Sequence, residues 1–397
     1  MKVLLYLADM VRGDLFNPET GTSLIEKYFK SNGGTYWPNT FTPSPDTPRS
    51  TACLFTGNNV VENGIGLRSL SLADSFRNDQ VSIFRSLAQN GIKNAIWRDR
   101  IEIDQGIWLP GDCLNQVEQF TSGIEISDWL SKEQNALVYR HDNTYHRVMD
   151  QLPIIRSPHQ VGLDLVFQNF LEAVEITDWD IIWFFSDHGC ILPNESKSPM
   201  DMLNRNRTNI PLYLWTRKDK DLTLNLSLRS IIDLYPTIHY QFGINLTNKI
   251  SGKNLLLDEG HQSIWMDDYA NFLPLDNELP NVYGERTIDK LTIYFENELW
   301  YKDEGNSNWS SAENSRIDLI EKMTSYFPFF NVVHLAAKRR QIIDRSYGNL
   351  SNRKSAFELK KFLLKKMMPV KFQKFIYQII FSSKFQKSAY KFRRSIK

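Results

Sequence analysis

KVLLYLAD at residues 2–9 and DIIWFFSDHG at residues 180–189 are the two most informative runs of this chain. Both are apolar without alternation, which is typical of strands that are buried on both faces of a parallel sheet. Helical patterns that begin near Ser23, Ser82 and Gly162 lie between and beside these runs. Because strands alternate with helices, the sequence predicts an open α/β sheet with helices on both faces.

The rest of the chain changes character along its length. Residues 207–217 (RTNIPLYLWTR) predict another strand, and residues 227–244 predict a helix that ends near Gly243. Residues 262–310 contain an alternating run, TIDKLTIYFENELWYKDEG, which predicts a small antiparallel subdomain. We therefore expect an α/β domain over residues 1–260, a small C-terminal subdomain over 261–350 and a basic helical tail over 351–397.

The composition excludes several classes of protein. The chain has 397 residues, of which 42% are apolar and 23% charged, and this excludes collagen-like, coiled-coil and wholly disordered proteins. Three cysteines are too few for a disulfide framework or a structural zinc site. The first apolar run stops at Asp9 without a cleavage site, and no run approaches the roughly 18–20 apolar residues that span a bilayer. We therefore expect a cytoplasmic protein.

The positive charge of the chain is concentrated at its C-terminus. Residues 351–397 contain 14 Lys and Arg and a single acid, Glu358, although the whole chain has a net charge of only +1. The remainder is acidic, which argues against a nucleic-acid partner. Within residues 357–397 an apolar helical face with flanking lysines favours peripheral contact with the inner face of a membrane. The alternative is a helix packed on its own acidic body or on a partner subunit. The apolar face consists of Phe372, Phe375, Ile376, Ile379 and Ile380.

Two acids follow the apolar strands directly. Asp9 ends the first run, and Asp187 ends the second, where it is followed by His188 and Gly189. Ligands bind open α/β sheets at the carboxyl ends of the strands, and carboxylate and imidazole groups are ligands for a divalent metal. The alternative is that both aspartates are helix caps or turn formers.

The third candidate segment is TPRSTACLFTG, residues 47–57. Pro48 suits the first turn of a helix and predicts Thr47 as its N-cap, where a hydroxyl would face the positive end of the helix. That position suits a nucleophile that attacks a phosphate or sulfate, with Arg49 holding the anion. Ser50 or Thr51 could be the reactive hydroxyl instead, and a plain structural cap is the simpler alternative.

These segments occur in an order that resembles the sulfatase branch of the alkaline phosphatase superfamily. The order is ADMVRGDL, TPRSTACLFTG, FFSDHG, RTNIPLYLW and IIDLYPTIHYQFGINLTNKISGKNLL, over roughly residues 1–260. The resemblance implies a three-layer sandwich with a mostly parallel sheet and an enzyme that cleaves or transfers a phosphoryl or sulfuryl group through a covalent intermediate. It implies one divalent metal ion, Zn²⁺, Mn²⁺ or Ca²⁺, and Thr47 as the nucleophile. The implied metal ligands are Asp9, Thr47, Asp187 and His188.

Departures from the family pattern refine this expectation. Sulfatases that use formylglycine need Cys or Ser where this chain has Thr47, and an Arg where it has Thr51. The resemblance therefore favours a phosphate ester over a sulfate ester, on a glycan or lipid-linked substrate. A second acid is also missing at Met10. The alternatives are a non-catalytic binding protein at a membrane surface and a true sulfatase.

Further polar residues are candidates for binding the anionic ester substrate. Asp142 and His146 have the Asp-x-x-x-His spacing of two-metal relatives, and His141 precedes them. We expect them to hold the substrate or leaving group at a one-metal site. Lys197 and Arg207 follow the Asp-His-Gly turn, where relatives place anion-binding groups; the alternative is a solvated loop. The sequence does not predict the oligomeric state.

Overall fold

We describe a computed structural model of the chain at residues 1–17, 20–65, 76, 79–98, 113, 116–150, 158–192, 195, 201–268, 282–295, 298–306 and 308–311. The chain divides into two compact units, Met1–His334 and Leu335–Lys397, and every described residue belongs to the first. The predicted basic tail and Lys197 lie outside the described residues. Within the described residues, none of the helices combines the length and apolar content needed to cross a membrane.

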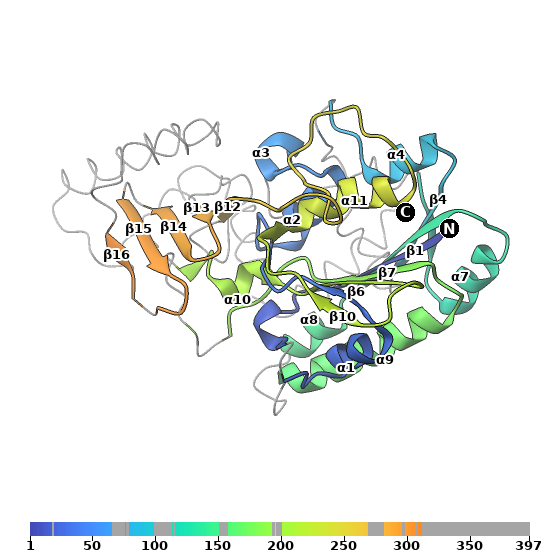
Figure 1. Ribbon diagram of the computed structural model, residues 1–397, viewed down its shortest axis with the longest axis horizontal. Helices are drawn as coiled ribbons and strands as arrows, with labels where there is room; N and C mark the ends of the chain where they lie inside the picture. The colour runs from blue at the N-terminus through green and yellow to red at the C-terminus, as the bar shows by residue number, and fades with distance from the viewer. Residues whose placement is uncertain are drawn as a thin grey trace, which may run out of the picture. The chain divides into compact units, whose positions relative to one another are not determined.

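An eight-stranded sheet forms the centre of this unit, in the order β10-β2-β9-β7-β1-β6-β4-β5 (Figure 1). Strand β1 pairs in parallel with both β6 and β7, so the two apolar runs of the sequence are neighbours. Among the described strands of this sheet, only β9 is antiparallel to its neighbours, β2 and β7. The bounds are β1 Lys2–Ala8, β2 Gly34–Tyr36, β4 Lys93–Arg98, β5 Glu118–Phe120, β6 Ala136–Asp142, β7 Ile181–Phe185, β9 Leu212–Thr216 and β10 Leu222–Leu224.

Helices cover both faces of the sheet, as predicted. Alternate residues of β1 enter opposite cores: Val3 and Leu5 face one set of helices, whereas Leu4 and Tyr6 face the other. The first set is α2 (Thr47–Thr56), α3 (Val60–Asn63), α4 (Ile83–Gln89) and α11 (Leu234–Gln241). The second set is α1 (Leu24–Asn32), α7 (Gly123–Leu130), α8 (Thr144–Met149) and α9 (Pro158–Glu175). The three-layer α/β sandwich is thereby confirmed.

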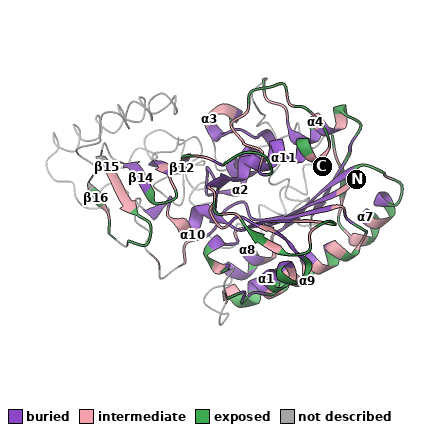
Figure 2. Cartoon of the chain, viewed as in Figure 1, coloured by how far each residue is buried: buried purple, intermediate pink, exposed green. Residues whose placement is uncertain are grey.

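Local signals in the sequence explain where several helices begin. Ser23 caps α1 and forms a capping box with Glu26, and Ser82 caps α4 by accepting the Arg85 amide. The strongest burial lies in the inner strands of the central sheet, such as β1, β6 and β7, and in α2 (Figure 2). Every residue of α2 is buried, so this helix is held rigidly on the sheet.

Two smaller sheets complete the described unit. A three-stranded sheet joins β11 (Arg229–Ser230), β3 (Thr40–Phe41) and β8 (Asn209–Ile210). A five-stranded antiparallel sheet follows, as predicted, and packs Ile264, Met266 and Ile293 in a core of its own. Its strands are β12 (Ile264–Asp268), β13 (Val282–Arg286), β14 (Lys290–Phe295), β15 (Glu298–Asp303) and β16 (Ser310–Ser311).

Candidate functional site

Three adjacent parallel strands end at the same edge of the central sheet. Asp9 follows β1, Asp187 and His188 follow β7, and His141 lies near the end of β6. The register pairs Leu7 of β1 with His141 on one side and with β7 on the other. Because these strands share one direction, their carboxyl ends bring residues far apart in the sequence into one group.

Asp9, Asp187 and His188 form a buried group whose ligand atoms all lie within 4.8 Å of one another. One oxygen of Asp187, Oδ2, is buried and accepts no hydrogen bond from the described residues. Burial raises the pKa of Asp187, and the negative charge of Asp9 raises it further. Two carboxylate oxygens and an imidazole nitrogen, with one of the oxygens buried and accepting no hydrogen bond within the described part of the chain, suit a divalent cation, so these residues fit the expected metal.

Backbone groups orient both residues of the Asp-His pair. The amides of Met10 and His188 donate to Asp187 Oδ1 at 3.1 and 2.9 Å, which leaves Oδ2 directed into the group. Met10 has φ 67° and is the one non-glycine residue with positive φ in the described part of the chain. His188 Nδ1 donates to the carbonyl of Gly189 at 2.7 Å, so Nε2 carries the free lone pair. No local pattern in the sequence predicts the conformation of Met10.

The hydroxyl of Thr47 completes the group. Its Oγ1 lies 3.2 Å from His188 Nε2 and 3.5 Å from Asp9 Oδ1. The prediction that Thr47 caps α2 was wrong by one residue: Asp46 is the cap and accepts the amide of Arg49 at 3.3 Å. Thr47 is therefore the first helical residue, which places its side chain at the start of α2.

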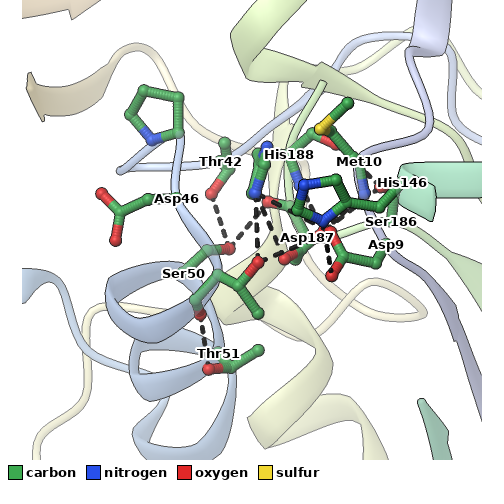
Figure 3. A network of polar contacts seen from close by, with 12 residues as sticks. Asp9, Met10, Thr42, Asp46, Ser50, Thr51, His146, Ser186, Asp187 and His188 are labelled. Carbon is green, nitrogen blue, oxygen red and sulfur yellow. Dashed lines mark hydrogen bonds and ion pairs between the residues drawn. The ribbon is translucent and has the colours of Figure 1, made fainter. Parts of the chain in front are cut away.

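The two alternative hydroxyls are engaged elsewhere. Ser50 Oγ donates to the carbonyl of Asp187 at 2.7 Å and accepts from Thr42, and Figure 3 shows it beside Asp187. Thr51 Oγ1 donates back to the carbonyl of Thr47 at 2.6 Å. Of the three hydroxyls, the geometry therefore favours Thr47 as the reactive one.

Two predicted substrate residues contact the other oxygen of Asp9. His141 Nε2 lies 3.3 Å and His146 Nδ1 lies 3.5 Å from Asp9 Oδ2. Burial would raise the pKa of Asp9, but its contacts with these two imidazoles hold the pKa below the ordinary value. The side chain of His146 is 30% exposed, so it lies on the side of the group that solvent reaches.

Asp142 lies on the opposite face of the sheet from this group. Its carboxylate accepts hydrogen bonds from the hydroxyl of Tyr6 at 2.5 Å, from Asn169 and from the amide of Thr144. Side chains alternate along a strand, so Asp142 points away where the preceding residue, His141, points in. The structure thus brings only the histidine of the Asp-x-x-x-His pair to Asp9.

The predicted anion-binding arginines lie in a different network. Arg49 is fully buried and pairs with Asp46, Asp267 and Asp268, while Arg207 pairs with Asp268 at 2.5 Å. Neither guanidinium is directed at the group around Asp9 by any of these contacts. The sequence could not reveal this network because Asp267 and Asp268 belong to the small C-terminal sheet.

Arg12 is likewise part of an ion-pair network. It pairs with Asp14 at 2.6 Å and with Glu195 at 2.8 Å. These contacts fix the segment that follows Asp9 against the segment that follows the Asp-His pair.

Comparison with solved structures identifies the architecture. The chain superimposes on an alkaline phosphatase superfamily protein from Vibrio parahaemolyticus with a TM-score of 0.59, at 11% identity over 84% of this chain and 87% of that one. It superimposes on a 2-O GAG sulfatase with a TM-score of 0.58, at 11% identity over 85% of this chain and 92% of that one. The chain has the alkaline phosphatase superfamily fold. The phosphonate monoester hydrolase of Agrobacterium radiobacter shares it, with a TM-score of 0.54 at 11% identity over 85% and 96%.

This fold is the one that the sequence motifs, through their resemblance to the sulfatase branch, led us to expect. No family model matches the chain, and a search of curated proteins finds no match. At this identity the solved structures show the fold alone, so the chemistry must be argued from the residues of this chain.

Proposed function

We propose that this chain is a metal-dependent hydrolase or transferase that acts on a phosphate ester through a covalent intermediate on Thr47. The observation that carries the proposal is the position of Thr47 Oγ1, between His188 Nε2 and Asp9 Oδ1. The oxygen of Asp187 that is buried and accepts no hydrogen bond from the described residues lies in the same group. A hydroxyl in such surroundings is placed to act as a nucleophile.

Asp9, Thr47, Asp187 and His188 would hold one divalent cation, Zn²⁺, Mn²⁺ or Ca²⁺. When bound, such an ion lowers the pKa of a neighbouring hydroxyl and neutralises charge on ester oxygens. The contacts within the chain orient the ligand atoms. Asp187 is oriented by two backbone amides, and His188 presents Nε2 because Nδ1 is held by a carbonyl.

The bond changes follow from this placement. Thr47 Oγ1 gives its proton to solvent water and attacks phosphorus, and the bond from phosphorus to the ester oxygen breaks with its electron pair on that oxygen, which takes up a proton as the alcohol leaves. The phosphoryl group is held on Thr47 until water or an alcohol attacks phosphorus and loses its proton, while Thr47 Oγ1 leaves and regains one. Thr47 begins α2, and the positive end of a helix dipole favours the negative charge that develops there. His141 and His146 flank Asp9 and offer N–H groups to the substrate or the leaving oxygen.

A phosphate ester is preferred over a sulfate ester because of the residue at position 47. Formylglycine cannot be made from Thr, and Cys53 cannot substitute for it. Cys53 is fully buried in the middle of α2, and burial raises the pKa of its thiol well above the ordinary value. We propose a glycan or lipid-linked phosphate ester as the substrate, in keeping with the basic segment 357–397, for which we propose contact with an anionic membrane surface.

Substitution of Thr47 tests this function. Thr47→Ala should abolish turnover of a panel of aryl phosphates, phosphodiesters and aryl sulfates assayed with each of the three metals. Thr56→Ala is the matched control, since that hydroxyl lies in the same helix and donates only to the carbonyl of Ala52. Mass spectrometry of quenched wild-type reactions should find a phosphoryl group on the peptide that contains Thr47. Full activity of Thr47→Ala would reject the assignment.

A further inference from the structure

A buried cluster of five charged side chains joins the small antiparallel sheet to the candidate site. Its members come from the start of α2, from the short helix α10 (Arg205–Thr208) and from the end of β12. All five are buried, and three carboxylates face two guanidinium groups. The cluster consists of Asp46, Arg49, Arg207, Asp267 and Asp268.

On one side the cluster holds the start of α2. Arg49 donates through Nε to Asp46 at 2.7 Å, through Nη1 to Asp267 at 2.5 Å and through Nη2 to Asp268 Oδ1 at 3.2 Å. Asp46 is also the N-cap of α2, and Figure 3 shows its carboxylate directed away from Asp9 and Asp187. The carboxylates of β12 therefore fix the turn from which Thr47 projects.

On the other side the cluster holds the loop of the Asp-His pair. Arg207 donates through Nη1 to Asp268 Oδ2 at 2.5 Å and through Nη2 to the carbonyl of Pro45 at 2.9 Å. The carbonyl of Arg207 accepts the amide of Gly189 at 2.7 Å. A Cβ at Gly189 would lie 2.1 Å from the carbonyl oxygen of Asn206, so this loop packs directly on α10.

The two oxygens of Asp268 contact different arginines, Oδ1 Arg49 and Oδ2 Arg207. One arginine belongs to the segment that carries Thr47, and the other packs on the loop that carries Asp187 and His188. A buried ionic cluster adds little net stability, because desolvation offsets much of its Coulombic energy. Its directional bonds can nevertheless fix one geometry for the parts they join.

We propose that Asp268 is a positioning residue, through which the small antiparallel sheet sets Thr47 against the Asp187–His188 loop. This inference rests on the proposed function, because it concerns the same metal and nucleophile group. The small antiparallel sheet would thus control the geometry of the site, although none of its described residues belongs to the group around Asp9.

The affinity for Mn²⁺ tests this role independently of turnover. Asp268→Asn in the full chain should keep the circular dichroism of the wild type but bind Mn²⁺ with an affinity reduced by about tenfold, the scale of effect that outer-shell partners of metal ligands have. The electron paramagnetic resonance spectrum of bound Mn²⁺ should change as well. Asp289→Asn is the matched control, because Asp289 is exposed in the turn between β13 and β14 of the same sheet. This variant should match the wild type in both measurements.

A folded Asp268→Asn variant with wild-type Mn²⁺ affinity and spectrum would overturn the inference. If that variant does not fold, Arg207→Lys replaces it, since it keeps the charge but cannot make both bonds, to Asp268 and to Pro45. An altered Mn²⁺ spectrum in Arg207→Lys supports the inference, and an unchanged one overturns it. A wild-type chain that binds no Mn²⁺, Zn²⁺ or Ca²⁺ is a different result, because it rejects the proposed function itself.

Discussion

Asp9 and Asp187 are two buried carboxylates that share one small space. Asp9 contacts two imidazoles through Oδ2, and Asp187 accepts hydrogen bonds from two backbone amides through Oδ1. Their remaining oxygens face His188 and Thr47. Two like charges without water are costly, and a cation between them removes that cost.

Asp187→Asn should therefore weaken metal binding strongly. The change keeps the shape of the side chain but removes the charge, so the affinity for Mn²⁺ should fall by at least the roughly 10- to 100-fold that changes outside the ligand shell produce. Isothermal titration measures it, with Asp178→Asn as an exposed control just before β7. Equal affinity in the two variants would contradict the ligand assignment.

The pH dependence of stability should carry a contribution from Asp267. Burial raises its pKa from the ordinary 3.8 to about 6, against the opposing charge of Arg49. Between these values the folded chain binds a proton that the unfolded chain does not, so this group's contribution to the free energy of unfolding falls as the pH rises, by roughly 3 kcal/mol in all. Asp267→Asn lacks this titration. In urea unfolding, the free energy of unfolding of Asp267→Asn should increase relative to that of the wild type between pH 4 and pH 7. A difference between the two that stays constant with pH would contradict the raised pKa of Asp267.

Helix α2 is the element on which the site depends most. Asp46 caps its first turn, and Gly57 ends it in the left-handed conformation with φ 66°, where its amide donates to the carbonyl of Cys53. A Cβ at Gly57 would lie 2.9 Å from Tyr235. Both the backbone and the packing thus require glycine at this position.

Gly57→Ala should destabilise the chain more than Gly243→Ala does. Gly243 ends α11 with a similar φ of 71°, but no atom lies within 4 Å of its added Cβ. The free energy of unfolding of Gly243→Ala should therefore fall only by the conformational cost of a left-handed alanine, about 1–2 kcal/mol. The free energy of unfolding of Gly57→Ala should fall by that amount and by an additional steric cost. Urea unfolding compares the two variants, and equal decreases would show that the Tyr235 side chain moves away from the added Cβ without cost.

The sequence predicted those strands, helix starts and strand ends that depend on neighbouring residues along the chain. The long apolar runs predicted β1 and β7, the serine caps predicted α1 and α4, and the acids after the strands predicted the edge where the site lies. The choice between Thr47, Ser50 and Thr51 was open, because it depends on how α2 is rotated against the sheet.

The remaining features depend on tertiary contacts. Which of His141 and Asp142 faces the site follows from the pairing of β6 with β1, which no local pattern shows. Asp267 and Asp268, which pair with Arg49 and Arg207, lie in β12, far along the chain from Arg49. Such long-range pairs leave no signal at short spacing.

In the molecule as a whole, metal binding should stabilise the folded state. A ligand that binds only the folded chain at 100 times its dissociation constant adds about 2.7 kcal/mol to the free energy of unfolding. The wild-type melting temperature should therefore rise by several degrees with Mn²⁺. Asp187→Asn should show no comparable rise at the same concentration. A rise in both would place the stabilising metal elsewhere.

The basic segment should give the chain affinity for anionic lipid. Full-length protein should co-sediment with phosphatidylglycerol vesicles at low salt, and less at high salt, because the attraction is electrostatic. Binding to phosphatidylcholine vesicles should be weak. A Lys371→Glu, Lys374→Glu double variant should reduce the binding to phosphatidylglycerol. Binding that depends on neither salt nor lipid charge would contradict the membrane proposal.

Anomalous diffraction from Mn²⁺-soaked crystals of the full chain would show where the metal binds. We expect a peak bounded by Asp9, Asp187 and His188, with Thr47 Oγ1 at coordinating distance. A chain that holds Mn²⁺ only at other positions, or a peak among these residues from which Thr47 is turned away, would contradict the proposed site.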